Sequence, residues 1–372
     1  MCLDVTYLIN LLSWLPGHSG FGSYVQRVVP GIDGLRLQLG ADAQAALLTP
    51  EQWSLEPPAW SSRRTMRFLQ RYGLVQHGLD LSALLQRDGI KLNEIEAIYS
   101  PFFDALLCWP EVPQLITCHD LTPLVASNSR KAWLRYRLWQ PRHCWVATRL
   151  IAISRYVADQ LVEFGVRSDR IEVIPNGIHI PRPPVPTPFS QDLLALARHD
   201  VNKNLPALFR GVSQLQRQCP QWRGVLRIVG RAGRQTALLQ RLHRQLPRPE
   251  QVELIDGLPQ DQLVACLRSS LALLSASTEE GFDYPVLEAK AEGIPTLISA
   301  IPVHREFHAD SSLFFPVDDD GTALARHLID LIRDPALWGD LSQRGLALAR
   351  SLSVERQVDA ISSQIRAFSL LS

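Results

Sequence analysis

TEEGFDYPVLEAKAEGIP, residues 278–295, carries two glutamates, Glu280 and Glu288, within one short stretch. A Gly-Phe turn follows Glu280, and the stretch closes near Gly293 before the apolar run 296–298. This order of breakers, helix formers and apolar residues predicts a turn, a helix, a second turn and a strand. A surface loop would scatter its charges, so both glutamates are candidates for binding a ligand.

The size and composition of the chain limit the class of protein to which it can belong. At 372 residues it exceeds one ordinary core, so two domains are expected. A hydrophobic content of 46% with 20% charged residues is typical of a globular protein. With 38 Lys and Arg against 37 Asp and Glu, the chain offers no overall attraction for nucleic acid or anionic lipid, although local patches remain open.

Cysteine spacing and hydropathy indicate a cytoplasmic protein. The six cysteines form no CxxC pair and no secretory leader precedes them, which favours reduced thiols. The apolar segment 1–17 has no basic flank and contains Asp4 and Asn10, so it fits a buried first strand better than a signal or anchor. No apolar run reaches about 18 residues, so no membrane span is predicted.

Short apolar runs alternate with longer amphipathic ones along the whole chain. This alternation predicts parallel sheets covered by helices, in two doubly wound, Rossmann-like α/β units facing across a cleft. The predicted strands are 97–99, 115–118, 150–153 and 171–174 in the first unit, and 193–197, 225–229, 252–255, 272–274 and 296–298 in the second. Helices are predicted over 131–148 and 155–164.

The domain boundary follows from a proline-rich segment. Residues 176–190 contain five prolines, which favour an extended connector. We therefore expect domains over 1–178 and 179–352. Residues 353–372 form an amphipathic helix with an apolar stripe through Val354, Val358, Ile361 and Ile365, and we expect this helix to return to the first domain.

Several polar residues follow predicted strands, where ligands of such sheets bind. Glycines 17, 20 and 22 precede a helix expected near Ser23, and such a loop can present backbone N–H groups to an anion; a plain tight turn is the alternative. His119 ends a strand, either as a ligand-facing imidazole or as a structural histidine.

Arg198 and Lys203 stand at the end of the second unit's first strand and the start of its helix. Two cations there could neutralise a diphosphate without a metal, although a solvated helix start is the alternative when they are taken alone. Together with Glu280 and Glu288, whose carboxylates suit sugar hydroxyls, they indicate a nucleotide sugar as the ligand.

At this point the sequence resembles a known family. EGFDYPVLEAKAEGIP is similar to the EGFG-x-P-x-x-E-A signature of the retaining family-four glycosyltransferases of the GT-B fold. The resemblance extends over nearly the whole chain through SGFGSYV, HDLTPL, IAISRYVADQLVEFGV, IEVIPNGI, ARHDVNKNL, RIVG and GIPTLIS, in the family's order and spacing.

The resemblance implies a role for each candidate residue. The first domain would bind the acceptor and the second the nucleotide sugar. Glu288 would bind the ribose hydroxyls and Glu280 the sugar ring, Arg198 and Lys203 would meet the diphosphate, and His119 would line the reacting face of the sugar. The loop Gly20, Phe21 and Gly22 would close over the diphosphate, and Gly281, Phe282 and Asp283 would belong to the donor site.

The implied activity is transfer of a hexose from a GDP- or UDP-sugar, with retention at the anomeric carbon and without a metal or other cofactor. Relatives sharing the HDLTPL stretch favour mannose and surface polysaccharide synthesis, with a saccharide or lipid-linked acceptor. A nucleotide-sugar epimerase of the same fold and a non-catalytic sugar-nucleotide-binding protein remain alternatives. A dehydrogenase is disfavoured, because neither glycine loop supplies GxGxxG with a later acidic residue.

Two departures from the family pattern bear on the donor. Ala197 stands where the family usually has glycine, which is a small change. Asp283 stands where the family usually has glycine or cysteine, and its carboxylate could accept a hydroxyl hydrogen bond from the sugar or repel phosphate. Asp283 therefore leaves the identity of the donor open.

Two further segments raise the question of a metal site and of a membrane-binding site. Asp318, Asp319 and Asp320 superficially suggest a cation, but acids ahead of a helix at Thr322 are better explained as caps, so no metal site is predicted. Residues 121–158 contain no acid and mix seven Lys and Arg with aromatics. They could lie against the inner face of a membrane, or form a partly buried helix with a solvated basic face.

Overall fold

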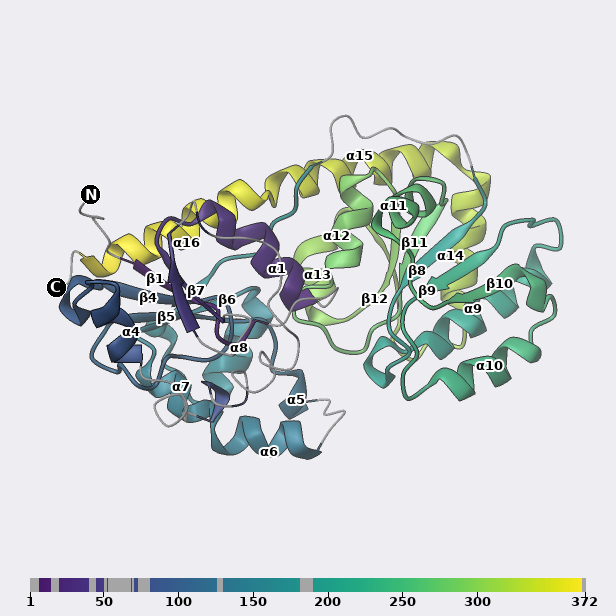
Figure 1. Ribbon diagram of the computed structural model, residues 1–372. Helices are drawn as coiled ribbons and strands as arrows, with labels where there is room; N and C mark the ends of the chain where they lie inside the picture. The colour runs from purple at the N-terminus through teal and green to yellow at the C-terminus, as the bar shows by residue number, and fades with distance from the viewer. Residues whose placement is uncertain are drawn as a thin grey trace. The chain divides into compact units, whose positions relative to one another are not determined.

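The computed structural model describes residues 7–14, 20–39, 45–49, 52, 68, 70–72, 81–125, 130–180 and 190–369. The chain divides into two compact units, of which the first comprises 1–177 with 354–372 and the second comprises 178–353 (Figure 1). Within the described residues, no helix has both the length and the apolar character that a bilayer-spanning segment requires. Each unit is described by itself below.

Among its described residues, the first unit has a seven-stranded sheet of order β3-β2-β1-β4-β5-β6-β7. All neighbouring strands are parallel except β2 and β3, which pair antiparallel. The strands are β1 Tyr7–Asn10, β2 Leu35–Leu39, β3 Ala45–Leu48, β4 Ala97–Ser100, β5 Gln114–Cys118, β6 Arg149–Ala152 and β7 Ile171–Val173. The helices are α1 Gly20–Val28, α4 Leu81–Arg87, α5 Thr122–Val125, α6 Arg130–Leu138, α7 Gln140–Val146, α8 Arg155–Glu163 and α16 Val354–Ser369, with short 3-10 turns η1 Val29–Gly31, η3 Leu92–Glu94 and η4 Ser168–Arg170.

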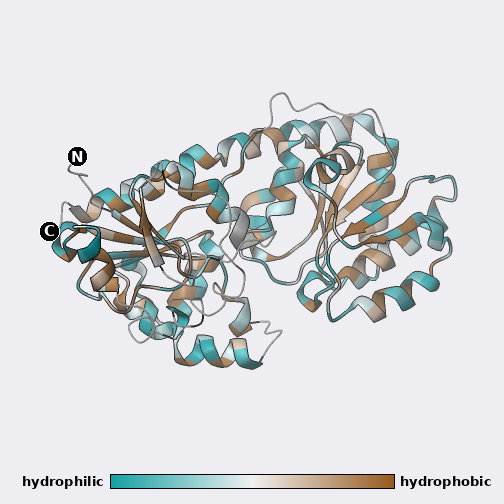
Figure 2. Cartoon of the chain, viewed as in Figure 1, coloured by the Kyte–Doolittle hydropathy of each residue, from teal (hydrophilic) through white to brown (hydrophobic). Residues whose placement is uncertain are grey.

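Alternate residues of these strands enter two separate cores, one on each face of the sheet. In β1, Ile9 packs with α1 and α16, whereas Leu8 packs with α4. Because both faces are covered, the central strands are continuous apolar runs rather than alternating ones. Figure 2 shows this as hydrophobic colouring concentrated on the strands.

The C-terminal helix α16 belongs to the first unit. Its residues Ile361 and Ile365 are fully buried against the sheet and α1. At the start of the helix, Gln357 accepts a hydrogen bond from the Gly177 backbone N–H at 2.8 Å and donates to the Asn176 side chain at 3.1 Å. The C-terminal helix α16 therefore buries its apolar stripe against the first unit, although it follows the second unit in the sequence.

The second unit has, among its described residues, a six-stranded sheet of order β10-β9-β8-β11-β12-β13 in which every pair is parallel. The strands are β8 Leu193–Leu196, β9 Leu226–Val229, β10 Val252–Ile255, β11 Ala272–Ser275, β12 Thr296–Ser299 and β13 Leu313–Phe315. The helices are α9 Leu205–Gln218, α10 Thr236–Arg244, α11 Gln260–Arg268, α12 Tyr284–Ala291, α13 Pro302–His308, α14 Thr322–Arg333 and α15 Pro335–Ser351, with 3-10 turns η5 Val201–Lys203 and η6 Pro249–Gln251.

This sheet, too, buries both faces. In β8, Leu193 packs with helices that include α9 and α14, and Leu194 packs with α11 and α12. The predicted α/β class with two Rossmann-like units is therefore confirmed, and the nine predicted strands lie within a residue or two of the observed ones.

Some local predictions were wrong. The helix predicted over 131–148 is two helices, α6 and α7, because Pro141 cannot donate a backbone hydrogen bond to the preceding turn. Helix α1 begins at Gly20 rather than near Ser23, so Gly20, Phe21 and Gly22 form its first turn instead of a loop before it. Strands β2, β3 and β13 were missed. Gly17 and most of the proline-rich connector lie outside the described residues.

Candidate active site

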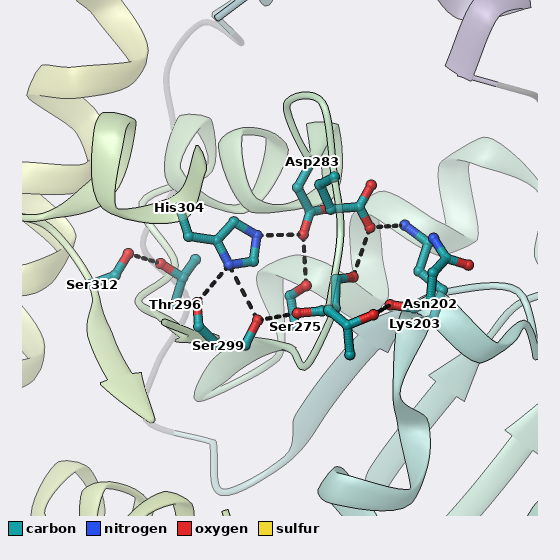
Figure 3. A network of polar contacts seen from close by, with 11 residues as sticks. Asn202, Lys203, Ser275, Asp283, Thr296, Ser299, His304 and Ser312 are labelled. Carbon is teal, nitrogen blue, oxygen red and sulfur yellow. Dashed lines mark hydrogen bonds and ion pairs between the residues drawn. The ribbon is translucent and has the colours of Figure 1, made fainter. Parts of the chain in front are cut away.

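The candidate site of the second unit is built where β8 and β11 end. These strands are parallel neighbours, so the segments that follow them, η5 and the loop 276–283, lie at the same edge of the sheet. The carbonyl oxygen of Asn202 in η5 accepts the Thr278 backbone N–H at 2.8 Å and the Thr278 hydroxyl at 3.3 Å. Two segments 76 residues apart in sequence are thereby fixed to one another; Figure 3 shows Asn202 beside Lys203 in this network.

The predicted residues Lys203 and Glu280 meet at this edge. Lys203 Nζ forms an ion pair with Glu280 Oε1, and the Ser277 hydroxyl donates to the same oxygen at 2.7 Å (Figure 3). The two charged side chains are only 23% and 14% exposed, so their pairing is less screened by water than a surface pair. Both bonds use Oε1, which leaves Oε2 of Glu280 with no partner among the described residues.

From the sequence, the Asp283 carboxylate could face the donor sugar, but the structure buries this carboxylate. Its backbone is left-handed, with φ of 63°, and its side chain is 3% exposed. The carboxylate turns into the unit, where Oδ2 accepts hydrogen bonds from the Ser275 hydroxyl at 2.6 Å and from His304 Nε2 at 3.0 Å. Burial alone would raise the pKa of Asp283, but the hydrogen bond from His304 and the charge of Lys203 hold it well below its usual range.

His304, which the sequence analysis missed, completes this arrangement. The ring is fully buried, and Nδ1 donates to the Ser299 carbonyl oxygen at 2.8 Å while Nε2 faces Asp283. Since both nitrogens face acceptors, the imidazolium form satisfies both bonds. The Ser299 hydroxyl donates to the Ser277 carbonyl oxygen at 2.5 Å, so His304 is also tied to the loop that carries Glu280 (Figure 3).

A small pocket brings these groups to one surface. Lys203, Ser275, Ser277 and Asp283 line it together with two alanines and four leucines, and its cavity volume is about 10 Å³. The pocket therefore collects the ends of β8 and β11 and the start of α12. Its polar lining is one cation, two hydroxyl groups and one carboxylate, which are groups that can bind phosphate or hydroxyl groups of a ligand.

Arg198, the other predicted cation, lies apart from the ion pair. Its side chain is 65% exposed, and its guanidinium lies 3.6 Å from the Asp200 carboxylate. Gly230, at the end of the neighbouring strand β9, packs so tightly here that a Cβ atom would lie 2.0 Å from the Ala197 carbonyl oxygen. The backbone leading to Arg198 is therefore fixed, while the arginine side chain reaches towards solvent.

The remaining residues of the signature differ in exposure. The Phe282 ring is buried against Tyr284 and Phe307, with ring centroids 5.4 and 4.9 Å apart, so its side chain belongs to the core and only its backbone can serve a ligand. Gly281 is buried, and Glu288 lies half-buried in the second turn of α12.

In the first unit, His119 follows β5 and is 8% exposed. Its Nε2 lies 2.9 Å from the Pro101 carbonyl oxygen, and its ring meets the Tyr24 ring of α1 edge-on at 4.4 Å. Burial lowers the pKa of His119 to about 4, so the ring is neutral at pH 7. This contact places His119 beside the helix whose first turn is formed by Gly20, Phe21 and Gly22.

Of the aspartates 318–320, Asp319 and Asp320 cap a helix, as predicted. Asp319 accepts the backbone N–H groups of Ala323 and Leu324, both at 3.1 Å, and Asp320 accepts that of Thr322 at 2.9 Å. Their oxygens thus satisfy the first turn of α14. Across the described ranges, no group of three or more His, Cys, Asp or Glu is arranged to hold a metal ion.

Comparison with known proteins covers both units. Residues 41–182 match the family model for Glycosyltransferase Family 4, and residues 190–346 match that for Glycosyl transferases group 1. The O-antigen chain mannosyltransferase RfbU of Salmonella typhimurium is 24% identical over 219 residues, which is 56% of this chain and 58% of that relative. Its match therefore spans little more than half of either protein.

Two solved structures share the fold over nearly the full length. Anabaena HepE in complex with UDP has a TM-score of 0.70 at 16% identity and covers 98% of this chain and 100% of its own. Sucrose-phosphate synthase from Thermosynechococcus elongatus has a TM-score of 0.71 at 16% identity, covering 99% and 100%.

Proposed function

Because the chain belongs to the family-four glycosyltransferases of the GT-B fold, we propose that it transfers a hexose from a nucleotide-diphosphate sugar with retention at the anomeric carbon. The observation that carries the proposal is the ion pair of Lys203 with Glu280 at the ends of β8 and β11, beside a small pocket that Lys203 also lines. A cation and a carboxylate fixed side by side suit the phosphate and the sugar of one donor.

Each predicted residue has a proposed role. Lys203 and Arg198 bind the diphosphate, Glu280 binds the sugar through Oε2, and Glu288 binds the ribose. A lysine ammonium carries three donors, so its bond to Glu280 does not by itself exhaust it. For the first unit we propose that His119 meets the sugar and that the N-terminal turn of α1 offers backbone N–H groups to phosphate. The buried Asp283 acts indirectly, by holding the loop.

The proposed step needs no covalent intermediate on the enzyme. The bond between the anomeric carbon and the diphosphate oxygen breaks, the acceptor hydroxyl bonds to the same face of the sugar, and its proton passes to the departing phosphate. Negative charge grows on the diphosphate, where Lys203 and Arg198 stabilise it. One well-placed donor of this kind is worth roughly 10²–10³ in kcat. These two cations take the place of a metal ion in the proposal.

Mannose is the proposed sugar, since the relative RfbU is named an O-antigen chain mannosyltransferase. The carrier is GDP or UDP, and the solved complex of HepE with UDP supports a nucleoside diphosphate. The acceptor is a saccharide or lipid-linked saccharide of surface polysaccharide synthesis. The enzyme would then work in the cytoplasm, in peripheral contact with the inner face of the membrane.

The test begins with thermal shift against UDP, GDP and their hexose conjugates, since a ligand that binds only the folded state raises the melting temperature. The selected donor is then incubated with saccharide acceptors. We expect nucleotide release that requires an acceptor, an α-configured product from an α-configured donor by NMR, and unchanged rates with EDTA. Isomerised donor without transfer would instead indicate an epimerase, and binding without turnover on any acceptor would indicate a binding protein.

A further inference from the structure

Helix α6 of the first unit exposes most of its apolar side chains. Trp133 is 43% exposed, Leu134 49% and Leu138 52%, whereas Tyr136 is the buried anchor of the helix. A single exposed leucine on a protein surface is ordinary, but a group of large apolar side chains on one short helix indicates a binding surface.

The exposed face of α6 has an ordered arrangement of apolar and basic residues. At about 100° per residue, the direction opposite Tyr136 lies between Leu134 and Leu138. Lys131 and Arg135 flank this leucine pair on one side, and three residues flank it on the other. These are Arg130, Trp133 and Arg137. An apolar ridge between two rows of cations is the pattern of a helix that lies in a membrane interface.

Neighbouring elements extend this surface. Val125 of α5 is 60% exposed and Trp145 of α7 is 81% exposed, and α5, α6 and α7 follow one another along one edge of the unit (Figure 1). Five of the eight large hydrophobic side chains that are exposed among the described residues therefore fall within 125–145. A sixth, Phe68, stacks on Tyr72, which in turn meets Trp139.

The positive charge of this surface indicates an anionic partner. Residues 121–158 contain no Asp or Glu. The described structure shows no ion pair for the cations of α6 and α7, namely Arg130, Lys131, Arg135, Arg137 and Arg142; Arg135 lies instead over the Tyr136 ring at 4.5 Å. The surface therefore fits a partner that is both anionic and apolar.

We propose that α6, with Val125 and Trp145 beside it, docks on the surface of an anionic lipid bilayer. Leu134 and Leu138 enter the acyl boundary, Trp133 lies at headgroup depth, and the flanking cations meet lipid phosphates. A second copy of this face would oppose cations to cations without any acid to pair them, and a nucleic acid would leave the leucines in water. The proposal deepens the proposed function by locating its membrane contact, but the surface stands without that function.

Vesicle co-sedimentation of the whole protein, without donor or acceptor, tests the inference. We expect binding to vesicles with about a third anionic phosphatidylglycerol and little binding to pure phosphatidylcholine. Raising the salt from 0.1 to 0.5 M should reduce the bound fraction at least fivefold, because the Debye length falls from about 10 Å to about 4 Å. Brominated lipid should quench tryptophan emission, and the double variant Trp133→Phe with Trp145→Phe should lose most of that quenching.

Two surface variants separate the apolar and the basic contributions. Leu134→Ser with Leu138→Ser, and Arg130→Gln with Lys131→Gln and Arg137→Gln, should each reduce binding about tenfold or more. The matched controls are Val201→Ser, a side chain that is 52% exposed in the second unit, and Arg241→Gln with Arg244→Gln on the exposed face of α10; both should bind as the parent does.

The inference is overturned if the protein ignores both kinds of vesicle, or if the two α6 variants bind as well as their controls. It is also overturned if sedimentation velocity shows a dimer that the leucine variant abolishes, since the face would then belong to a second copy. These readouts involve no sugar transfer. An inactive protein that binds anionic vesicles therefore refutes the proposed function alone, and an active protein that ignores them refutes this inference alone.

Discussion

Asp283 and His304 form a fully buried pair in which Oδ2 and Nε2 lie 3.0 Å apart, although Asp283 holds a left-handed backbone. A left-handed conformation costs an ordinary residue roughly 1–2 kcal/mol, and aspartate tolerates it better than most. The hydrogen bonds of Asp283 to His304 and Ser275 offset this cost at a position where the family usually has glycine or cysteine. Through this pair, the loop after β11 is connected to α13.

Asp283→Asn should destabilise the second unit by about 3 kcal/mol, because it keeps the side-chain shape but removes the charge that His304 faces. Ser275→Ala, which removes the other hydrogen bond to Asp283 Oδ2, should cost only about 1 kcal/mol. Urea unfolding at pH 7 measures both. A double variant with His304→Gln should cost less than the sum of the single changes, and strict additivity would contradict the pairing.

The same pair predicts a sensitivity to acid. The pKa of Asp283 in the folded protein is lower than the ordinary value of about 3.9. Its stabilisation is therefore complete above that value and is lost as the pH falls through the lower, folded value. The stability of Asp283→Asn should accordingly approach that of the parent as the pH is lowered below about 4, as followed by urea titration. A constant gap down to pH 2 would argue against the charged pair.

Lys203→Ala should reduce donor binding and lower kcat about 10²–10³-fold, because it removes a held cation from the developing charge of the diphosphate. Arg198→Ala should also weaken the diphosphate site, but less, since Arg198 is 65% exposed and water screens its charge. Calorimetry with the nucleoside diphosphate and steady-state kinetics measure the two effects. Arg241→Ala on α10 is the charge-matched control, and parental activity in both site variants would remove the phosphate site.

Glu288→Ala should weaken binding of the bare nucleotide, whereas Glu280→Ala should leave that binding within a few fold and impair sugar transfer instead. The distinction follows from their proposed partners, the ribose for Glu288 and the sugar ring for Glu280. Calorimetry with the nucleoside diphosphate and with the intact donor separates the two variants. Equal losses with both ligands would contradict the division of roles.

The contact of Lys203 with Glu280 shows what the sequence could predict. Both residues were expected just beyond strand ends, and the carboxyl ends of parallel strands share one edge of a sheet. Adjacency of β8 and β11 then brings together residues 77 positions apart. The pattern of buried runs was sufficient to predict that both lie at this edge, although their direct ion pair depends on how η5 and the loop pack.

Side-chain direction could not be predicted in the same way. Asp283 looked ligand-facing in the sequence, but its inward turn depends on His304, which lies 21 residues further on. The signal that could have found His304 is its place just after the strand ending at Ser299, the same edge rule applied once more. Strand β3 was missed because it pairs antiparallel at the edge of an otherwise parallel sheet, which the alternation of strands and helices does not encode.

The buried Lys290 of α12 predicts that the protein becomes more stable as the pH rises above neutral. Its side chain is 1% exposed, and Nζ donates to the Ser311 hydroxyl at 2.7 Å and to the Ser311 carbonyl oxygen. Burial lowers the pKa of Lys290 to about 7. An unfolded lysine has a pKa of about 10.4, so between these values the unfolded chain binds more protons than the folded one. Stability must therefore rise with pH over this window.

Lys290→Met keeps the length of the side chain against Gly345, where the Lys290 Cγ lies close to the glycine, and removes the titrating group. Up to about 5 kcal/mol of differential protonation is at stake over the full window. We expect the variant to match or exceed the parent in stability at pH 7 and to lose most of the rise up to pH 9.5. Urea unfolding at several pH values measures this slope. Ser311→Ala, which keeps the amine, should retain the rise, as should Lys131→Met on the exposed face of α6. A parental slope in Lys290→Met would mean that another titrating group controls this window instead.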